Sequence, residues 1–389
     1  MRVLFASTHG SGHFNPLVPL AEACLRGGHE VLVAGTSLLA PAVEERGYPF
    51  RECGRPREED IRPIWDRVPT IAPEAANELV VREIFARLNV LAILPRLRAA
   101  IEEWGPDLVL RDPNEYGSAV AAELHGVPHA RVAIGLGAVE EGALRLAAGP
   151  LDEIRRSLGL PADPEGDRIR RTPFLSSFPA SLEYPDEPSP PHAPRFRGGE
   201  AESGARPLPD WWPGRDGPLV YVTLGSVTAS IPAAAAAYPV VIEAMADVPA
   251  RVLLTVGRAG DPDALGPLPA NVHVERWVPH ADVVAAADAV VCHGGSGTVI
   301  GTLAAGLPQV VVPLFADQPY NAERVAAVGA GLAVAPAGES APAAIRTAVG
   351  AVLGDESYRL AAERLAAEMR RSPEADSVLE TLLAQAAAV

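Results

Sequence analysis

Short apolar runs alternate with amphipathic stretches through the first part of the chain. The run Arg2–Ala6 predicts a strand, and a helix from about Pro16 follows, because apolar residues recur there at helical spacing. The order then repeats, which is typical of βαβ units with parallel strands. The further elements predicted here are a strand over His29–Ala34, a helix over Leu38–Arg46, a partly helical insertion over residues 55–100, a strand over Asp107–Leu110, a helix over Gly117–His125 and a strand over Ala130–Ile134.

This alternation stops between residues 179 and 218, where prolines are dense, and restarts afterwards. Proline at that density disfavours helices and central strands, so we expect an interdomain linker. The chain is predicted to divide into domains over residues 1–205 and 218–371, the end of a linker over 206–217, and a terminal helix over 372–389 that could pack back on the first domain. The elements predicted for the second half are strands over Leu219–Leu224, Arg251–Val256, Val272–Trp277, Ala289–Cys292 and Gln309–Pro313, with helices over 233–246, 297–305, 341–353, 357–371 and 374–387.

Composition and charge restrict the function. The chain has 389 residues, of which 48% are hydrophobic, enough for two cores. Its net charge of -16 disfavours nucleic acids and anionic membrane surfaces as partners. A small anion is still compatible, because helix N-termini bind phosphate without cationic side chains. All 33 basic residues are arginines, which excludes a phosphate-binding lysine and a Schiff base.

The cysteines and the N-terminus favour the cytoplasm. Cys24, Cys53 and Cys292 form no CxxC pair, and such a sparse, odd set is typical of a reducing compartment. The first residues lack the apolar region and cleavage site of a signal peptide. We find no apolar run long enough to span a bilayer, so we expect no membrane insertion.

A glycine-rich segment in the second half is a candidate anion site. It follows a predicted strand, opens a predicted helix, and runs from His293 through Gly294, Gly295, Ser296 and Gly297 to Thr298. Backbone N–H groups, hydroxyls and the helix dipole could hold a diphosphate there. A plain glycine-rich turn explains the same residues equally well.

Three neighbouring segments strengthen the diphosphate hypothesis. Asp317 and Gln318 follow the next strand and could bind adjacent sugar hydroxyls. Trp277, followed by Val278, ends an earlier strand with an aromatic plane suited to a nucleobase. Gly225 and Ser226 end the first strand of this half and leave room for phosphate.

At this spacing, the segments Trp277–His280, His293–Thr298 and Ala316–Gln318 resemble the donor half of inverting GT-B glycosyltransferases, in particular the bacterial enzymes that decorate antibiotics and other natural products. The resemblance implies an α/β fold of two Rossmann-like domains facing a central cleft, with the acceptor bound by the N-terminal domain and the donor by the C-terminal domain. In that family the tryptophan stacks on the base, the His-Gly-Gly segment binds diphosphate and the Asp-Gln pair contacts the sugar. The donor would be a dTDP-sugar or UDP-sugar, with a deoxysugar favoured. The related plant signature has glutamine at the position of His280, so the contact made by His280 stays open.

The N-terminal loop matches the family's GHxxP pattern over Gly12–Pro16, which adds Gly12 to the donor site and implies that His13 is the general base. The chemistry agrees, because an imidazole with a pKa of about 6.5 can take a proton from an acceptor hydroxyl near neutral pH. Such a histidine usually has a carboxylate on its other nitrogen. Asp112 is the preferred partner, and Glu115 is the alternative.

The sequence says little about the acceptor site. The resemblance implies that the insertion and the segment Ile134–Leu146 form an apolar pocket for a small hydrophobic aglycone. The residues that could line it, or could equally be ordinary core, are Trp65, Ile71, Phe85, Leu136 and Leu144.

Some other functions conflict with the sequence, and others share the expected fold. The segment Gly10–Gly12 begins a dinucleotide-binding pattern but does not complete it, which disfavours NAD. His9 and His13 are separated by glycines and do not form a helical metal face, so we expect neither a metal nor another cofactor. A sugar-nucleotide 2-epimerase and a non-catalytic helper protein share the expected fold. The oligomeric state is open, with a homodimer as one alternative.

Overall fold

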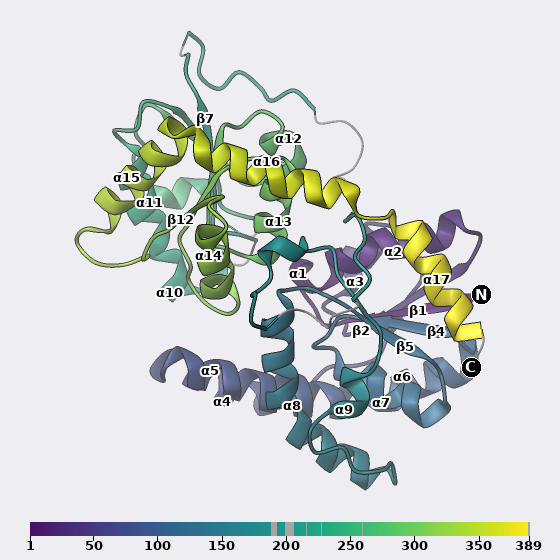
Figure 1. Ribbon diagram of the computed structural model, residues 1–389. Coiled ribbons are helices and arrows are strands. Elements are labelled where there is room, and N and C mark those ends of the chain that lie inside the picture. Colours follow the sequence, from purple (N-terminus) through teal and green to yellow (C-terminus); the bar gives the residue numbers. More distant parts are fainter. Residues whose placement is uncertain (188–192, 199–205, 215, 227, 259, 388–389) are drawn as a thin grey trace. The chain divides into compact units, whose positions relative to one another are not determined.

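The computed structural model describes residues 1–187, 193–198, 206–214, 216–226, 228–258 and 260–387. The chain forms two units, each with its own parallel sheet (Figure 1). The first unit comprises Met1–Phe178, Glu183–Gly199 and Ser372–Val389. The second comprises Pro179–Leu182 and Glu200–Arg371.

The first unit has a six-stranded sheet in the order β3-β2-β1-β4-β5-β6, in which every neighbouring pair is parallel. Its inner strands are nearly continuous apolar runs because helices cover both faces. The strands are β1 (Arg2–Ser7), β2 (Glu30–Gly35), β3 (Phe50–Glu52), β4 (Leu108–Arg111), β5 (His129–Val132) and β6 (Phe174–Leu175). The helices are α1 (Ser11–Phe14), α2 (Val18–Arg26), α3 (Ala40–Glu44), α4 (Glu58–Arg67), α5 (Pro73–Leu79), a π-helix (Val80–Asn89), α6 (Val90–Trp104), α7 (Tyr116–His125), α8 (Gly137–Ser157), α9 (Asp167–Arg170) and α17 (Ala375–Ala387).

The second unit repeats this plan, with strand order β12-β11-β10-β7-β8-β9 and parallel pairs throughout. The strands are β7 (Leu219–Thr223), β8 (Arg251–Thr255), β9 (Val272–Glu275), β10 (Ala289–Cys292), β11 (Gln309–Val311) and β12 (Gly331–Ala333). The helices are α10 (Pro232–Ala235), α11 (Ala237–Met245), α12 (His280–Val284), α13 (Ser296–Ala304), α14 (Gln318–Ala327), α15 (Ala341–Gly354) and α16 (Glu356–Arg371).

The strand order places the ligand sites. In each sheet the order of strands reverses between two central parallel neighbours, β1 with β4 and β7 with β10. In open α/β sheets, ligands bind at the carboxyl ends of the strands at such a reversal. The loops that leave these four strands hold His13, Asp112, Gly225 and His293.

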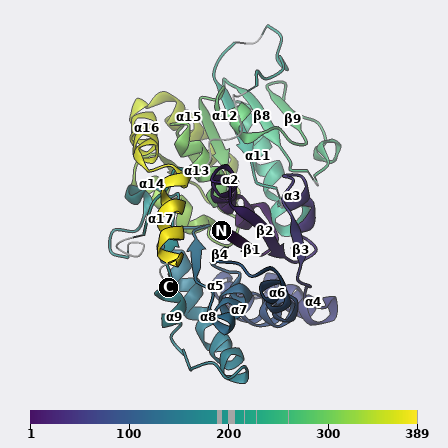
Figure 2. The same ribbon diagram turned by 90° about the vertical axis from the view of Figure 1, so that its right-hand side faces the viewer.

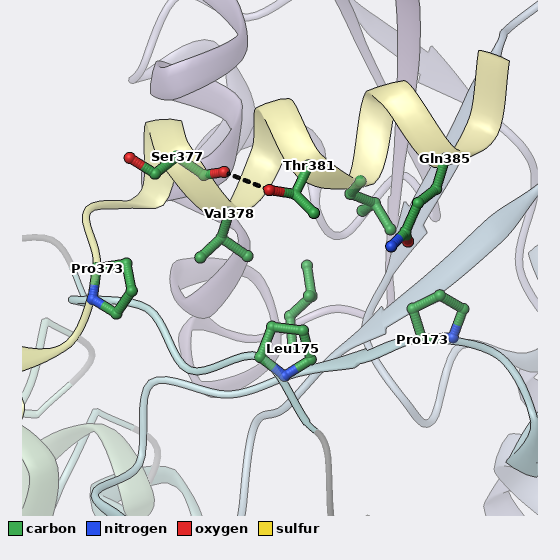
Figure 3. Close-up of a pocket in the computed structure, with 9 residues that line it drawn as sticks. Pro173, Leu175, Pro373, Ser377, Val378, Thr381 and Gln385 are labelled. Atoms are coloured by element: carbon green, nitrogen blue, oxygen red, sulfur yellow. Dashed lines mark hydrogen bonds between the residues drawn. The ribbon is translucent and has the colours of Figure 1, made fainter. Parts of the chain in front are cut away.

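The C-terminal helix α17 belongs to the first unit, where it lies against α2 (Figure 2). Arg26 of α2 and Asp376 of α17 form an ion pair at 2.6 Å, and Leu379 and Leu382 are buried in the core. A small apolar pocket lies between α17 and the segment around β6, with Leu175, Pro373 and Val378 in its wall (Figure 3). None of the predicted site residues lines this pocket.

Most predicted elements are confirmed within two residues, and the differences have local causes. The short strands β3, β6 and β12 were missed because two or three residues carry no periodicity. The helix expected over 233–246 is two helices, α10 and α11. Within the Pro-rich segment, Phe196 is only 1% exposed and packs into the core of the first unit.

Candidate functional site

In the first unit, the site is built around His13. Gly10 adopts φ 112°, a conformation that favours glycine, and its carbonyl accepts the backbone N–H of His13 at 3.2 Å. The loop predicted at this place is therefore a helical turn, α1, that presents the imidazole. Nδ1 of His13 lies 3.4 Å from Oδ1 of Asp112, and the two side chains are 23% and 0% exposed.

Asp112 is fixed by donors on both carboxylate oxygens. Oδ2 accepts the backbone N–H of Thr8 at 2.7 Å and the hydroxyls of Thr8 and Ser7 at 3.2 and 3.3 Å. Oδ1 accepts the N–H groups of Asn114 at 2.7 Å and Glu115 at 3.1 Å. The carboxylate that faces the imidazole therefore has one orientation.

The electrostatics keep this carboxylate ionised. Burial alone would raise the pKa of Asp112, but His13 and the N–H groups of Thr8 and Asn114 stabilise the charge, and the pKa lies below its ordinary value. Glu115, the alternative partner, instead caps α7 by accepting the N–H of Ser118 at 3.0 Å. Burial raises the pKa of Glu115. Of the two carboxylates, Asp112 is the one beside His13.

Arg111, which the sequence analysis missed, supports the same loop. It is fully buried, and its Nη1 donates to the carbonyls of Asp112, Pro113 and Glu115 at 3.0–3.1 Å. Burial lowers the pKa of this guanidinium. An arginine ending an otherwise apolar strand was the available signal, because such a side chain must find acceptors when it is buried.

The residues predicted for the acceptor pocket differ in exposure and in their contact with His13. The ring of Phe85, on the π-helix, lies 5.9 Å from the ring of His13. Trp65 on α4 is 48% exposed, and Ile71 is partly buried. Leu136 and Leu144 are buried, and are 0% and 2% exposed, respectively. Phe85 is thus the candidate that the structure brings to His13.

In the second unit, the ring of His293 packs between two glycines. A Cβ added at Gly225 or Gly295 would lie 2.6 or 2.5 Å from Nε2 of His293, so neither position accepts a side chain with the ring in place. Burial lowers the pKa of His293 to about 4. This histidine is therefore neutral at pH 7.

The start of α13 offers backbone donors. Gly294 has φ 88°, and a Cβ there would meet Val311 Cγ1 at 2.7 Å, so the turn requires glycine. The backbone N–H of Thr298 donates to the carbonyl of Gly295 at 3.0 Å. The N–H groups of Ser296 and Gly297 have no hydrogen-bond partner among the described residues, as expected for the first turn of a helix. These groups can bind an anion.

A hydrogen-bond network joins this helix start to the next loop. The hydroxyl of Ser296 donates to Oδ2 of Asp317 at 2.7 Å. Asn321 on α14 donates through Nδ2 to the Gly294 carbonyl, to Ser296 Oγ and to Asp317 Oδ2 at 2.8–3.0 Å. Asn321 was missed by the sequence analysis, and the signal was its place one helical turn after Asp317.

Gln318 is held from within its own loop. It is 2% exposed, and its Oε1 accepts the N–H groups of Leu314 and Phe315 at 2.7 and 3.0 Å. Ala316, which lies between Phe315 and Gln318, has φ 56°, a rare conformation for a residue with a side chain. The Asp317-Gln318 pair therefore stands on a tightly constrained turn.

The remaining donor-site candidates differ in exposure. Trp277 is 48% exposed, with the guanidinium carbon of Arg258 4.3 Å from its ring centroid. Val278 is partly buried, and Ser226 and Gly12 are exposed. His280, whose contact was left open, packs its ring 5.7 Å from that of Tyr221, and burial lowers its pKa to about 4.

No group of three or more His, Cys, Asp or Glu among the described residues is placed to hold a metal ion. No helix in the described part of the chain is long and apolar enough to cross a membrane.

Comparisons with known proteins agree over nearly the whole chain. The family models described as erythromycin biosynthesis protein CIII-like, N-terminal and C-terminal domain, match residues 23–152 and 239–385. L-demethylnoviosyl transferase of Streptomyces niveus is 33% identical over 99% of this chain and 98% of its own. The glycosyltransferase SnogD of Streptomyces nogalater has a TM-score of 0.77 at 28% identity, covering 99% of both chains. The glycosyltransferase VinC in complex with dTDP has a TM-score of 0.74 at 25% identity, covering all of both chains. The predicted two-domain α/β fold of the GT-B type is confirmed.

Proposed function

The chain belongs to the family of erythromycin biosynthesis protein CIII-like glycosyltransferases, and on that premise we propose that it moves a deoxysugar from a nucleoside diphosphate to a hydroxyl of a small hydrophobic natural product. As a natural-product glycosyltransferase, it is an enzyme that uses a sugar donor and a small-molecule acceptor. The observation that carries the proposal is the pairing of His13 with the buried, fixed carboxylate of Asp112.

The donor would bind to the second unit. The base would stack on Trp277, whose ring is half-exposed, and dTDP is favoured over UDP because VinC is complexed with dTDP. The diphosphate would accept hydrogen bonds from the N–H groups of Ser296 and Gly297, helped by the dipole of α13. The sugar would contact Asp317 and the amide nitrogen of Gln318, since Oε1 of Gln318 is already used by its own loop.

The acceptor hydroxyl would lose its proton to Nε2 of His13, because Nδ1 faces Asp112. As the proton leaves, the acceptor oxygen attacks the anomeric carbon from the side opposite the diphosphate, and the bond to the diphosphate breaks. The configuration at the anomeric carbon inverts. Asp112 stabilises the imidazolium, and the start of α13 stabilises the charge on the departing diphosphate.

The proposed mechanism needs no metal and no further cofactor, since backbone donors and a helix dipole serve the leaving group. The relatives and neighbours are named as transferases, which sets aside the 2-epimerase and the non-catalytic helper. A homodimer and a place in the cytoplasm stay predictions.

The test is a screen of the purified protein with dTDP-sugars, UDP-sugars and a mixed library of hydroxylated aglycones, read by mass spectrometry. We expect a product whose mass is that of an aglycone plus one sugar, together with free nucleoside diphosphate. The anomeric configuration of the product, determined by NMR, should be opposite to that of the donor. Nucleotide released at the same rate without any aglycone would contradict the transferase proposal.

A further inference from the structure

One buried side chain, that of Asn321, is hydrogen-bonded to two parts of the proposed donor site. Asn321 is 1% exposed, and its Nδ2 reaches Gly294 O at 2.8 Å, Ser296 Oγ at 3.0 Å and Asp317 Oδ2 at 2.9 Å. Gly294 and Ser296 belong to the helix start that would bind diphosphate. Asp317 belongs to the turn that would bind the sugar.

The chemistry of the partners fixes the orientation of this amide. A backbone carbonyl and a carboxylate only accept hydrogen bonds, so the nitrogen of Asn321, and not its oxygen, must face Gly294 and Asp317. An amide nitrogen has two hydrogens for three acceptors, so one hydrogen is shared between two of them. Oδ1 of Asn321 has no hydrogen-bond partner among the described residues.

The orientation of the amide also sets the direction of the next bond. Ser296 Oγ accepts from Asn321 and lies 2.7 Å from Asp317 Oδ2, which can only accept. The single hydroxyl hydrogen of Ser296 is therefore donated to the carboxylate. While this network is intact, the Ser296 side chain cannot also donate to a phosphate.

We propose that Asn321 is a positioning residue of the donor site, which commits the Ser296 hydroxyl to Asp317, leaves the diphosphate to the backbone N–H groups of α13 and aligns Asp317 for the sugar. This inference rests on the proposed function, and it assigns roles that the sequence pattern does not. The Ser296 side chain serves the sugar side of the donor through Asp317. The backbone of the same residue serves the diphosphate.

Asn271 provides a matched control in the same unit. It is 4% exposed, and its Nδ2 also donates to three acceptors, the carbonyls of Met245, Val248 and Ala250, at 2.9–3.2 Å. Asn271 precedes β9, at the amino end of the sheet, away from the loops that hold the donor site. Asn321→Leu and Asn271→Leu therefore remove equivalent hydrogen bonds from different places.

The experiment measures binding of dTDP and UDP by calorimetry, steady-state kinetics with the sugar donor, and thermal unfolding for the wild type, Asn321→Leu, Asn271→Leu and Ser296→Ala. Both asparagine variants should unfold at lower temperature than the wild type. Asn321→Leu should lose about tenfold or more in kcat/KM for the sugar donor and in affinity for nucleoside diphosphate, whereas Asn271→Leu should stay within about threefold in both. Ser296→Ala should bind nucleoside diphosphate within about threefold of the wild type while losing about tenfold in kcat/KM for the sugar donor.

The outcomes separate the two proposals. A wild-type protein that binds no nucleoside diphosphate contradicts the proposed function. A wild type that binds, with Asn321→Leu indistinguishable from Asn271→Leu, overturns the positioning role alone. A tenfold loss of nucleoside diphosphate affinity in Ser296→Ala also overturns it, because the hydroxyl would then serve the phosphate directly. Should Asn321→Leu fail to fold, Ser296→Ala decides, since its side chain is partly exposed and small.

Discussion

Two glycine-rich loops, one in each unit, present a histidine between a central strand and a helix, but the histidines have different surroundings. His13 follows β1, is 23% exposed, and has the carboxylate of Asp112 3.4 Å from Nδ1. His293 follows β10 and is packed between Gly225 and Gly295, and burial lowers its pKa to about 4. Both loops are rich in glycine, but His13 follows its glycines and His293 precedes them, and the chemistry available to the two imidazoles differs.

The difference lies in what faces each ring. A buried carboxylate can hold an imidazole in one tautomer and stabilise its charged form, which a general base needs. Two glycine backbones offer no such charge, so His293 stays neutral and fills space beside the start of α13. The proposed mechanism therefore assigns proton transfer to the first unit and charge stabilisation to the second.

Apart from His13 itself, the largest expected effect comes from Asp112. Asp112→Asn places an amide against groups that all donate, and it removes the charge beside the imidazole, so kcat should fall by about 10²–10³-fold. Glu115→Gln keeps an acceptor for the Ser118 N–H and should retain kcat within about threefold. Steady-state assays of both variants, with circular dichroism to confirm folding, test this. Equal losses in the two variants would remove the distinction between Asp112 and Glu115.

A smaller effect is expected from filling the space beside His293. Gly295→Ala would place a Cβ 2.5 Å from Nε2 of the ring, which must move and disturb the start of α13. We expect about tenfold weaker binding of nucleoside diphosphate and about 1–3 kcal/mol lower stability. Gly350→Ala on α15, where a Cβ meets nothing within 4 Å, should leave binding unchanged and raise stability by up to about 1 kcal/mol, because alanine favours a helix interior over glycine. Calorimetry and urea unfolding measure both quantities, and unchanged binding in Gly295→Ala would show that the ring position is irrelevant to the donor.

Substitutions of two equally exposed tryptophans should distinguish the donor site from the acceptor site. Trp277 and Trp65 are each 48% exposed, in the second and first unit respectively. Trp277→Ala should raise KM for the sugar donor about tenfold, because base stacking on an aromatic ring contributes about 1–3 kcal/mol. Trp65→Ala should leave the donor KM unchanged and affect only the acceptor. Initial-rate kinetics with each substrate varied would expose the opposite assignment.

The smallest effect concerns pH. Because the folded-state pKa of His293 is about 4, below the ordinary value, the unfolded chain binds a proton between about pH 6.5 and 4 that the folded protein does not. Acidification through this range should therefore destabilise the folded protein. The stability contributed by neutral His293 is fully present only above the pKa of this histidine in the unfolded chain. NMR of the imidazole signals should show His293 neutral down to about pH 5. A midpoint near pH 6.5 for His293 would contradict its buried, uncharged state.

Several of these features could be predicted from the sequence and others could not, for physical reasons. Parallel strands buried on both faces are continuous apolar runs, so β1, β4, β7 and β10 were located correctly together with the loops that follow them. The π-helix that carries Phe85 was not predicted, because its apolar spacing does not differ visibly from that of an α-helix over ten residues. Leu136 was left open between the acceptor pocket and the core and is buried, and the choice depends on contacts that a local pattern does not contain.

Network residues were the least accessible to sequence analysis. Asn321 and Arg111 each act through several partners that are distant in sequence or belong to the backbone, and a single polar residue carries no periodicity. The choice between Asp112 and Glu115 likewise depended on which carboxylate the turn after β4 directs at His13. Only two residues, Pro113 and Asn114, lie between the two candidates, and the backbone geometry distinguishes them.

In the proposed mechanism His13, and not His293, exchanges a proton with the acceptor. This assignment is tested most directly by the single-turnover rate of His13→Ala with saturating sugar donor and a hydroxyl acceptor identified in the screen, together with its affinity for dTDP. We predict a rate lower by about 10²–10⁴-fold with dTDP affinity within about threefold of the wild type, because the base is lost and the donor site in the second unit is intact. A His13→Ala variant that transfers sugar at nearly the wild-type rate would contradict the account.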